Sequence, residues 1–555
     1  MRLPFLKQAV AGDDLYFLYG AEHALVEPLH PLNAKYAFQG EIVDMRGHTH
    51  GPVDPWILAL LLTVFGSFRE VPFHAFFVLF SLIAGIAAWF IAVRFTDRPL
   101  VATLLFLAVP PFVVNGNTLE ADVPFIAFWL LAIALYVYEH PMGAAVAAAV
   151  AALTSYQAVL LTPILFFAPV ARRRWIPLLA APAAVVVFQA FERLSGDALP
   201  AAMLTGYMWS HAWQSLHMKW LNAVALVGHL IVNIVFPAIW IDWKRIDKNR
   251  FLWLWAGIFF AGALVIFFAG AARYLLPMAL PLCIVAAQSR LAWVALVLQL
   301  VLGTGRAVVN YEHWNAYPQI ARDIPKARRV FVNGEWGIRH YLEELGATPF
   351  LTTQTLHAGD IVVSTGYAPK IDAQSVKVYE HEIDSAIPLR IVFLGGGSAF
   401  SSVGSGMIWP ISFSREPLDR VRAEMIVEVK PTLEYVKIKT PEAASHIVSG
   451  INNADGWALE KGLIALKRPE GTAVLRASFY IPPAGAGREV ELSIDGTRVA
   501  AKRYDEAGVF TLQSEPLDGK AGRVVVAIST DKPLRVEGDE RALGVVLTEI
   551  GFARP

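Results

Sequence analysis

Apolar and polar positions divide this chain into two unlike parts. Residues 54–304 are almost continuous apolar runs, whereas 306–555 mix apolar and polar positions as soluble proteins do. A helix that crosses a bilayer needs about 20 apolar residues, and fewer where it is short or broken. The first part therefore predicts a polytopic α-helical membrane domain with about 10 spans. We expect them near 71–93, 99–114, 122–138, 142–154, 156–170, 174–191, 219–240, 251–269, 272–288 and 290–304.

One apolar run, 55–66, is too short to be counted among the spans. Counting it would place Arg94 and Arg98 on the outer side. Pro55 and Trp56 at its start suit an anchor in the membrane interface. We therefore expect an interfacial helix lying on the outer surface.

Basic residues in the short loops set the orientation, because such loops stay in the cytoplasm. They occur at Arg94 and Arg98, Arg172–Arg174, Lys244–Arg250, and Arg290. Threading the spans in order puts all four loops on one side. The outer side then receives 1–53, 115–121, 192–218, 270–273 and everything after Gly305. Asp13 then lies outside with no span before it. Either the chain starts outside or, as we expect, a further apolar helix lies upstream of Met1.

The charge balance and the single cysteine limit which partners and sites we expect. Charged residues make up 17% of the chain, against about 25% in soluble proteins. Lys+Arg and Asp+Glu are both 47, so the net charge indicates no nucleic-acid partner. The single Cys283 excludes an internal disulfide and a CxxC metal site.

The polar part predicts two further domains. Arg329–Val332, Ile338–Leu345 and Asp360–Ser364 read as strand, helix and strand, so 306–425 should hold an extracytoplasmic α/β unit. Strands separated by Pro/Gly turns follow and predict a β-sandwich over 426–555. Examples are Ala473–Ile481, Glu489–Ile494, Val509–Gln513 and Arg523–Ile528.

Acidic residues stand beside apolar helices on the predicted outer face. Asp13 and Asp14 come first, and Glu120 and Asp122 precede a later span. A carboxylate such as Asp122 is favoured at a helix start by the helix dipole. Ionisable groups at a membrane edge also tend to mark a functional site, and both interpretations stay open for these acids.

Arg273 lies on the same predicted face as the acids. Together they have the groups that a site for group transfer would need. A carboxylate can take a proton from an attacking hydroxyl. Arginine can bind a phosphate through two nitrogens and offset the charge of a leaving group. The combination suits a phosphate-linked, membrane-bound substrate.

Four short motifs resemble one known family. In chain order they are Asp13-Asp14-Leu15-Tyr16, His50-Gly51-Pro52-Val53, Leu119-Glu120-Ala121-Asp122-Val123-Pro124 and Arg273-Tyr274-Leu275-Leu276-Pro277. They are similar to the Asp-Glu-x-x-Tyr, His/Lys-Pro-Pro-Leu, acidic-loop and Arg-Tyr-x-x-Pro motifs of polyprenyl-phosphate-sugar-dependent glycosyltransferases of the GT-C fold. That group includes the protein O-mannosyltransferases, the lipid A aminoarabinose transferase and the RgtA/B/C/D-like proteins. The resemblance covers about residues 10–304.

The resemblance implies roles for these residues. Asp13 would be the catalytic base, supported by Asp14 and by Glu120 or Asp122. The substrate-binding set would contain Tyr16, His48, His50, Arg273 and Tyr274, with Arg273 on the carrier phosphate. His48 or His50 would bind the donor or a possible divalent metal, or would be solvated loop residues.

Two departures from the family are visible. Gly51 replaces a proline, and Thr154-Ser155-Tyr156-Gln157 stands where relatives often have Thr-Lys-Gly. If that lysine helps to bind the donor in relatives, its role here is open. In the last domain, Asp455-Gly456-Trp457 and Asp539–Gly544 resemble a jelly-roll module of bacterial glycosyltransferases. Trp457 is either a sugar-stacking or a core residue.

We therefore expect a GT-C-like membrane domain in 1–305, followed by the α/β unit and the jelly-roll-like β-sandwich. Its function would be transfer of a sugar from a polyprenyl-phosphate carrier to a glycan, lipid or protein acceptor of the envelope. The enzyme would lie among the lipids of a bacterial cytoplasmic (inner) membrane. The alternatives are a transporter or flippase for lipid-linked sugars and a non-catalytic envelope protein. A transporter needs polar or broken helices near mid-membrane, whereas these spans are nearly free of charge.

Overall fold

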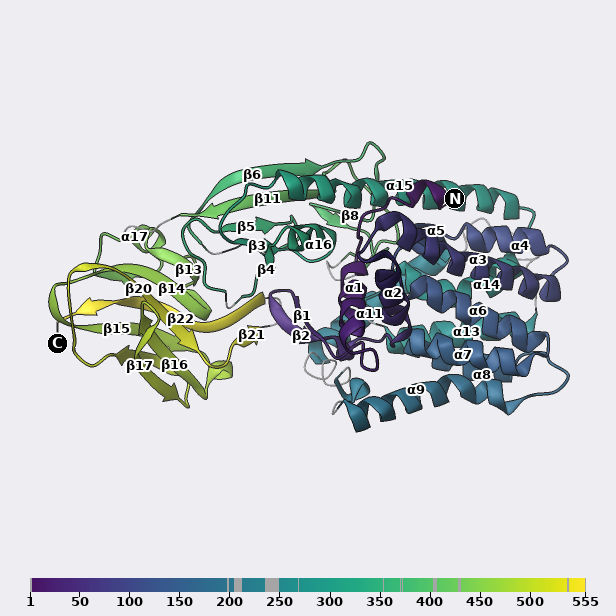
Figure 1. Cartoon of the computed structure of the whole chain (residues 1–555), viewed down its shortest axis with the longest axis horizontal. Helices are drawn as coiled ribbons and strands as arrows, with labels where there is room; N and C mark the ends of the chain where they lie inside the picture. Colours follow the sequence, from purple (N-terminus) through teal and green to yellow (C-terminus); the bar gives the residue numbers. More distant parts are fainter. Residues whose placement is uncertain are drawn as a thin grey trace.

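The computed structural model describes residues 2–196, 199–203, 212–234, 249–267, 269–352, 354–369, 371, 373–402, 407–427, 431–536 and 539–554. A bundle of helices forms one end of the elongated molecule and a β-rich module forms the other (Figure 1). A smaller α/β unit lies between them, beside the N-terminal helix α1 (Asp14–Val26). The predicted basic loop at Lys244–Arg250 and the end of the predicted span 219–240 fall largely outside the described residues.

The apolar runs form helices where the sequence predicts them. In chain order these are α2 (Val53–Phe65), α3 (Glu70–Phe95), α4 (Pro99–Leu107), α5 (Pro110–Val114), α6 (Asp122–Val137), α7 (Pro141–Thr154), α8 (Leu161–Phe166), α9 (Trp175–Ser195), α11 (Ala212–His229), α13 (Arg250–Ile266), α14 (Leu276–Ala286) and α15 (Ala292–Asp323). Among the described residues, α3, α9 and α15 are long and apolar enough to cross a membrane by themselves. The number of spans stays a prediction.

Two of the expected spans are interrupted. The run 99–114 divides at Val109, since Pro110 and Pro111 follow it and proline has no N–H for a helical hydrogen bond. The run 156–170 begins as a 3-10 turn, Tyr156–Leu160, before α8. Short helices of this kind leave turns inside the bundle.

Helix α15 (Ala292–Asp323) runs across the predicted domain boundary at 305/306. We expected a span at 290–304 and a new domain from 306, but the helix continues without interruption to Asp323. Apolar residues end near 304, whereas helical side chains continue to be buried, among them Arg306, His313 and Tyr317. The predicted boundary at 305/306 therefore lies inside a helix. It was placed where the apolar residues end, and the helix continues beyond them.

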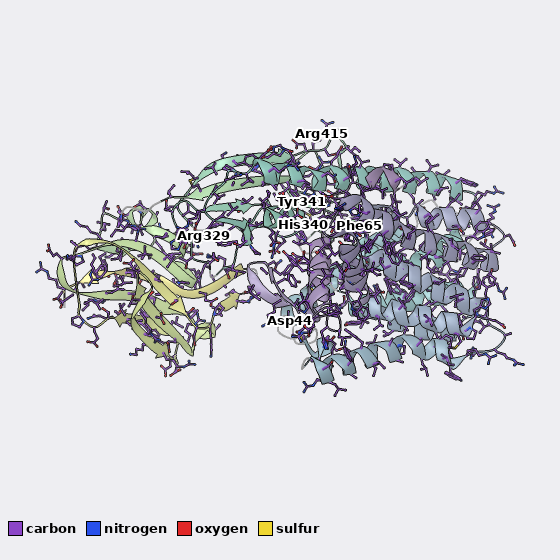
Figure 2. All side chains as sticks on the ribbon, viewed as in Figure 1. Asp44, Phe65, Arg329, His340, Tyr341 and Arg415 are labelled. Atoms are coloured by element: carbon purple, nitrogen blue, oxygen red, sulfur yellow. The ribbon has the colours of Figure 1, made fainter. Side chains whose placement is uncertain are left out.

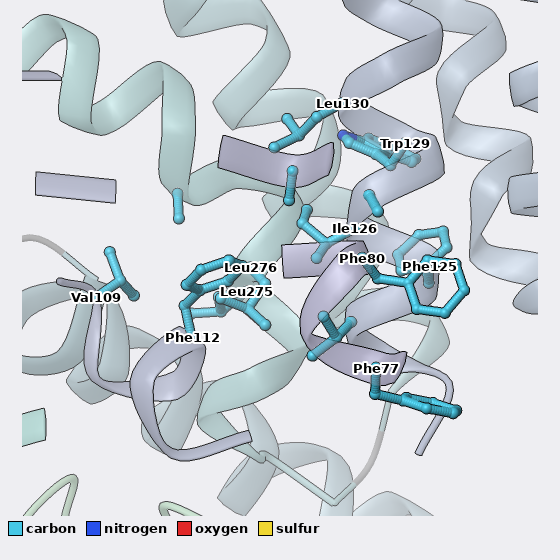
Figure 3. Packing of buried hydrophobic residues seen from close by; sticks show 14 of the residues in the cluster. Phe77, Phe80, Val109, Phe112, Phe125, Ile126, Trp129, Leu130, Leu275 and Leu276 are labelled. Atoms are coloured by element: carbon cyan, nitrogen blue, oxygen red, sulfur yellow. The ribbon is translucent and has the colours of Figure 1, made fainter. Parts of the chain in front are cut away.

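Large aromatic side chains fill the centre of the bundle. Phe77, Phe125 and Trp129 lie in one cluster that joins α3 to α6 (Figure 3). The Trp129 ring meets Phe259 of α13 edge-on, with centroids 5.5 Å apart, and the indole N–H of Trp255 donates to the Pro277 carbonyl at 3.0 Å. These contacts hold α13 against α6, which follows the acidic loop, and against α14, at whose start the late motif ends.

The exposed surface along helix α3 of the bundle is apolar. On α3 the side chains of Leu79, Leu82, Ile86 and Phe90 are exposed. A contiguous apolar surface of this kind is typical of contact with a membrane or another protein.

The N-terminal region adds a hairpin that the sequence did not predict. Strand β1 (Lys35–Phe38) pairs antiparallel with β2 (Glu41–Asp44). The hairpin lies between the bundle and the β-rich module (Figure 1), and Glu41 forms an ion pair with Arg535 of that module.

The α/β unit contains the predicted strand, helix and strand as β3 (Val330–Asn333), α16 (Gly337–Glu344) and β5 (Ile361–Ser364). Strands β3 and β5 are parallel. The five-stranded sheet has the order β4-β3-β5-β11-β6 and is completed by β4 (Thr348–Pro349), β6 (Ser375–Ile383) and β11 (Asp419–Ile426). Two small pairs accompany it, β7 (Leu389–Arg390) with β10 (Ser412–Phe413) and β8 (Val392–Phe393) with β9 (Gly396–Gly397). On α16, His340 and Tyr341 lie on the side of the unit toward the bundle (Figure 2).

The C-terminal module is β-rich, as predicted. Its strands are β12 (Tyr435–Lys437), β13 (Ile447–Ile451), β14 (Trp457–Arg468), β15 (Gly471–Ile481), β16 (Arg488–Ile494), β17 (Thr497–Tyr504), β18 (Gly508–Gln513), β19 (Leu517–Gly519), β20 (Gly522–Thr530), β21 (Leu534–Val536) and β22 (Asp539–Ala553). The main path is β17-β16-β20-β14-β22-β15-β18, and β14 changes partner from β22 to β20 along its length. Phe479, Leu475 and Val526 are among the residues of its core. Trp457 is half-buried, so both interpretations of that residue stay open.

Candidate active site

Arg273 lies at the centre of a cluster of three carboxylates. Its Nη2 is 3.3 Å from Oδ2 of Asp13, its Nη1 is 3.4 Å from Oε2 of Glu120, and its Nε is 3.2 Å from Oδ2 of Asp122. Each guanidinium nitrogen therefore contacts a different acid. The structure thus joins four of the residues that the sequence placed on one face.

Short turns between helices position the four side chains. Asp13 is the residue before α1, Asp122 is the first residue of α6, and Arg273 belongs to a 3-10 turn before α14. Glu120 lies in the loop that precedes α6 and accepts a hydrogen bond from the Asp13 N–H at 3.3 Å. All four therefore lie at helix ends, where the backbone can bring charged side chains together.

Gly12 makes the close approach of the two acidic loops possible. Its φ is +50°, a conformation that favours glycine, and an added Cβ would lie 2.9 Å from Oε1 of Glu120. The residue before the proposed base is therefore restricted both by its backbone and by the space around it.

The three acids of the cluster differ in how far their side chains are exposed to solvent. The Asp13 side chain is 41% exposed, whereas Asp122 is 13% and Glu120 is 6% exposed. Burial raises the pKa of Glu120 well above its usual range, although Arg273 opposes the shift. Asp13 is therefore the most exposed acid of the cluster, and burial favours the neutral form of Glu120.

Asp14 has a different environment from its neighbour. It is fully buried, and its two oxygens accept backbone N–H groups from Ala11 at 3.0 Å and Leu119 at 2.7 Å. Burial raises the pKa of Asp14 to about 7, despite these two hydrogen bonds. Asp14 thereby holds the two acidic loops together, and its expected place among the catalytic acids stays a prediction.

The two tyrosines of the predicted binding set are also engaged with the protein. Tyr16 is buried, and its hydroxyl donates to Oε2 of Glu335 at 2.8 Å. Tyr274 stacks on Phe267 with ring centroids 4.2 Å apart, and the Arg273 guanidinium lies 5.7 Å from the Tyr274 ring. Tyr16 therefore joins α1 to the α/β unit, while Tyr274 flanks the arginine.

The two histidines stand in different surroundings. His48 is hydrogen-bonded to the Tyr36 hydroxyl. Within the described part of the chain, Nδ1 of His50 is buried and has no hydrogen-bond partner. Burial lowers the pKa of His50 to about 3, so its imidazole is neutral at physiological pH. A neutral imidazole can bind a metal, but the described residues contain no group of three or more His, Cys, Asp or Glu side chains arranged to hold one.

The two departures from the family pattern lie against each other. The Gly51 N–H donates to the Thr154 carbonyl and the Tyr156 N–H to the Thr49 carbonyl, both at 3.2 Å. A Cβ at position 51 would overlap the carbonyl oxygen of Leu153. Glycine at this position is therefore required by the segment beside it.

Two residues near the site were missed by the sequence reasoning. The indole N–H of Trp336 donates to Oδ1 of Asp13 at 3.2 Å. Asp54, at the start of α2, is fully buried, and neither of its carboxylate oxygens has a hydrogen-bond partner among the described residues. Trp336 lies far from Asp13 in the chain, and Asp54 begins an apolar run, so neither belonged to a recognisable motif.

Comparison with known proteins finds a family model whose match contains two of the four motifs, those at His50 and at Leu119. The model of the family described as dolichyl-phosphate-mannose-protein mannosyltransferase matches residues 49–192, about a quarter of the chain. The matched segment contains His50, Glu120 and Asp122. No curated protein matches the sequence.

Solved structures include two similar transferases of low identity. ArnT from Cupriavidus metallidurans in the apo state is 13% identical, with 65% of this chain and 89% of that chain covered and a TM-score of 0.39. A mutant of arabinofuranosyltransferase AftD from Mycobacteria is 12% identical, with 98% of this chain and 62% of that chain covered and a TM-score of 0.32.

The family match supports, over residues 49–192, the resemblance stated from the sequence. Over residues 49–192 the chain is therefore similar to a family of glycosyltransferases.

Proposed function

We propose that this protein transfers a sugar from a polyprenyl-phosphate carrier to a hydroxyl of an envelope glycan, lipid or protein at the outer face of the bacterial cytoplasmic membrane. The observation that carries this proposal is the contact of one guanidinium, on Arg273, with three carboxylates from two distant loops. It supplies a base and a phosphate-binding cation within one cluster.

Asp13 takes the proton of the acceptor in this reaction. The acceptor oxygen forms a bond to the anomeric carbon of the sugar as its proton moves to the Asp13 carboxylate. The bond between that carbon and the phosphate oxygen breaks, and its electron pair leaves with the carrier phosphate. Arg273 offsets the negative charge that develops on the leaving phosphate.

The protonation of Glu120 matters for phosphate binding. A guanidinium matched by three ionised carboxylates would repel a phosphate, because the cluster would carry a net negative charge. Burial raises the pKa of Glu120 well above its usual range and so favours its neutral form. With Glu120 neutral, the cluster repels the carrier phosphate less than it would with three ionised carboxylates.

The position of the cluster supports a transferase more than a transporter. Asp122 begins α6 and Arg273 precedes α14, so the charged groups lie at the ends of apolar helices. Alternating transport relies on polar groups in broken helices near mid-membrane. The Trp336–Asp13 hydrogen bond also places the cluster on the same side of the bundle as the α/β unit, which supports an outer-face site with the following domains outside.

Mass spectrometry of a deletion strain tests the proposal. We expect one polyprenyl-phosphate sugar to accumulate and one envelope glycan, lipid or protein to lose the same sugar. The wild-type gene should restore the product, whereas an Asp13→Asn gene should not. Full restoration by Asp13→Asn, at equal protein level, would refute the assigned chemistry.

A further inference from the structure

The α/β unit contributes a side chain to the acid cluster. Trp336 stands before α16, and its indole N–H donates to Oδ1 of Asp13 at 3.2 Å, across 323 positions of the chain. The other oxygen of Asp13 contacts Arg273 of the bundle at 3.3 Å. The two carboxylate oxygens are therefore held by different parts of the molecule.

The backbone around Trp336 is held by its surroundings. Trp336 has φ 62° and ψ −153°, a conformation that is rare for a bulky residue and strained. An added Cβ on the next residue, Gly337, would overlap the Val10 carbonyl oxygen and lie 3.0 Å from Trp314. Strained backbone persists where packing over-determines it and is enriched at functional sites.

Neighbouring contacts hold the segment on both sides of Asp13. The Val10 N–H donates to the Tyr341 hydroxyl at 2.9 Å, and the Tyr16 hydroxyl donates to Glu335 at 2.8 Å. The Tyr341 hydroxyl also donates to Oε1 of Glu70, at the start of α3, at 3.4 Å. The α16 region thus contacts residues 10, 13 and 16, and Trp336 makes the contact to the carboxylate itself.

We propose that Trp336 is a positioning residue for Asp13, and this inference rests on the proposed function. The indole N–H holds one oxygen of Asp13, so that the carboxylate keeps a fixed direction toward the acceptor hydroxyl. Tryptophan donates this hydrogen bond without accepting one. A hydrogen bond donated to a carboxylate also favours its ionised form, which is the form that accepts a proton. The domain after α15 thereby takes part in the reaction.

Trp336→Phe tests the inference because it keeps an aromatic ring and removes the N–H. Turnover is measured on the full-length protein in lipid nanodiscs, with the polyprenyl-phosphate sugar that accumulates in the deletion strain. We expect kcat to fall about 10- to 100-fold, as for loss of a hydrogen bond to a charged group, with little change in the KM of the donor. The pH–rate profile is recorded as well, because loss of a hydrogen bond to the base alters it whereas a purely structural defect does not.

Trp314→Phe is the matched control. Trp314 lies beside the same turn, and its indole N–H donates to Asn310 at 2.8 Å and not to the acid cluster. This variant should keep the wild-type kcat and pH profile. If Trp336→Phe does not fold, benzothienylalanine at position 336 replaces the N–H by sulfur within the same ring shape and provides the same test.

The two proposals fail in different ways. The Asp13→Asn, Trp336→Phe double variant should be no slower than Asp13→Asn alone, because Trp336 acts through Asp13. A Trp336→Phe enzyme with wild-type kcat and pH profile, together with an inactive Asp13→Asn enzyme, overturns the positioning role and leaves the proposed function intact. An active Asp13→Asn enzyme overturns the proposed function itself.

Discussion

Nη2 of Arg273 lies 3.3 Å from Oδ2 of Asp13, although 260 positions separate the two residues. A base and a phosphate-binding cation can act on one substrate when they share a cluster. If they had lain on opposite sides of packed helices, the transferase chemistry would have lost its physical basis. The contact is therefore compatible with the two proposed roles, Asp13 as base and Arg273 as phosphate-binding cation, and each role can be tested by its own substitution.

Asp13→Asn should abolish transfer and leave the protein folded. Asparagine is close in shape to aspartate but does not accept the acceptor's proton at neutral pH. General-base catalysis contributes about 10²–10⁴-fold to rate, so turnover should fall by that order while the thermal midpoint changes little. Asp97→Asn, at an exposed loop position, is the control and should keep full turnover. An Asp13→Asn enzyme within a few-fold of wild type would contradict the role of Asp13.

Arg273→Lys should weaken binding of the carrier phosphate more than it affects folding. Lysine keeps the positive charge but loses the planar group whose three nitrogens each contact a different carboxylate. Loss of one charged hydrogen bond corresponds to about 10-fold in affinity. Native mass spectrometry with undecaprenyl phosphate measures this directly. Arg94→Lys, on an exposed side chain at the end of α3, should bind as wild type, and equal affinity of both variants would remove Arg273 from the phosphate site.

Asp14 predicts a stability that falls as pH rises. Its carboxyl group has an ordinary pKa of 3.8, which burial raises to about 7 in the folded protein. Between these values the folded state keeps a proton that the unfolded state has released, so unfolding becomes easier by up to about 1.4 kcal/mol per pH unit. Glu120 adds a slope of the same sign.

Thermal midpoints of wild type and Asp14→Asn, measured from pH 5 to 8, check this expectation. The wild-type midpoint should fall with pH, and the slope should be smaller in Asp14→Asn, which lacks the titrating group. Asp97→Asn should keep the wild-type slope. Equal slopes for wild type and Asp14→Asn would show that Asp14 does not titrate in this range.

The sequence predicted the apolar helices, the β-rich C-terminal region and the association of Arg273 with Asp13, Glu120 and Asp122. Those features follow from hydrophobic runs and from the order of loops on one face. The sequence did not predict that Asp13 is exposed and Asp14 is buried. Whether an acid of an adjacent pair is exposed or buried depends on a distant backbone donor, that of Leu119.

The contribution of Trp336 was hidden for a related reason. The predicted α/β unit was assigned as a separate domain, and the residue between its first strand and its helix had no chemical signature in the sequence. The contact arises because α15 continues past the apolar region to Asp323 and brings α16 beside Val10. Long-range packing of this kind is not encoded in local periodicity.

The topology is open to a fusion experiment. Since Trp336 is hydrogen-bonded to Asp13, the acid cluster and the residues after α15 lie on one side of the bundle, which we expect to be the outer side. Alkaline phosphatase, which is active outside the cytoplasm, should be active when fused to the C-terminus. The same enzyme fused after Asp97, in an expected cytoplasmic loop, should be inactive. An expressed but inactive C-terminal fusion would reverse the orientation and move the site to the cytoplasm.

Gly51→Ala should destabilise the protein, because the segment at 153–156 leaves no room for a methyl group at position 51. The added Cβ would overlap the carbonyl oxygen of Leu153, and the Gly51–Thr154 and Tyr156–Thr49 hydrogen bonds would have to lengthen. Overpacking of this kind typically costs about 1–3 kcal/mol. Gly47→Ala is a matched control four residues earlier, where an added Cβ meets nothing within 4 Å. We expect a lower thermal midpoint for Gly51→Ala and an unchanged one for Gly47→Ala. Equal midpoints would mean that the two segments separate readily, and that the glycine found in place of the family's proline is not required by packing.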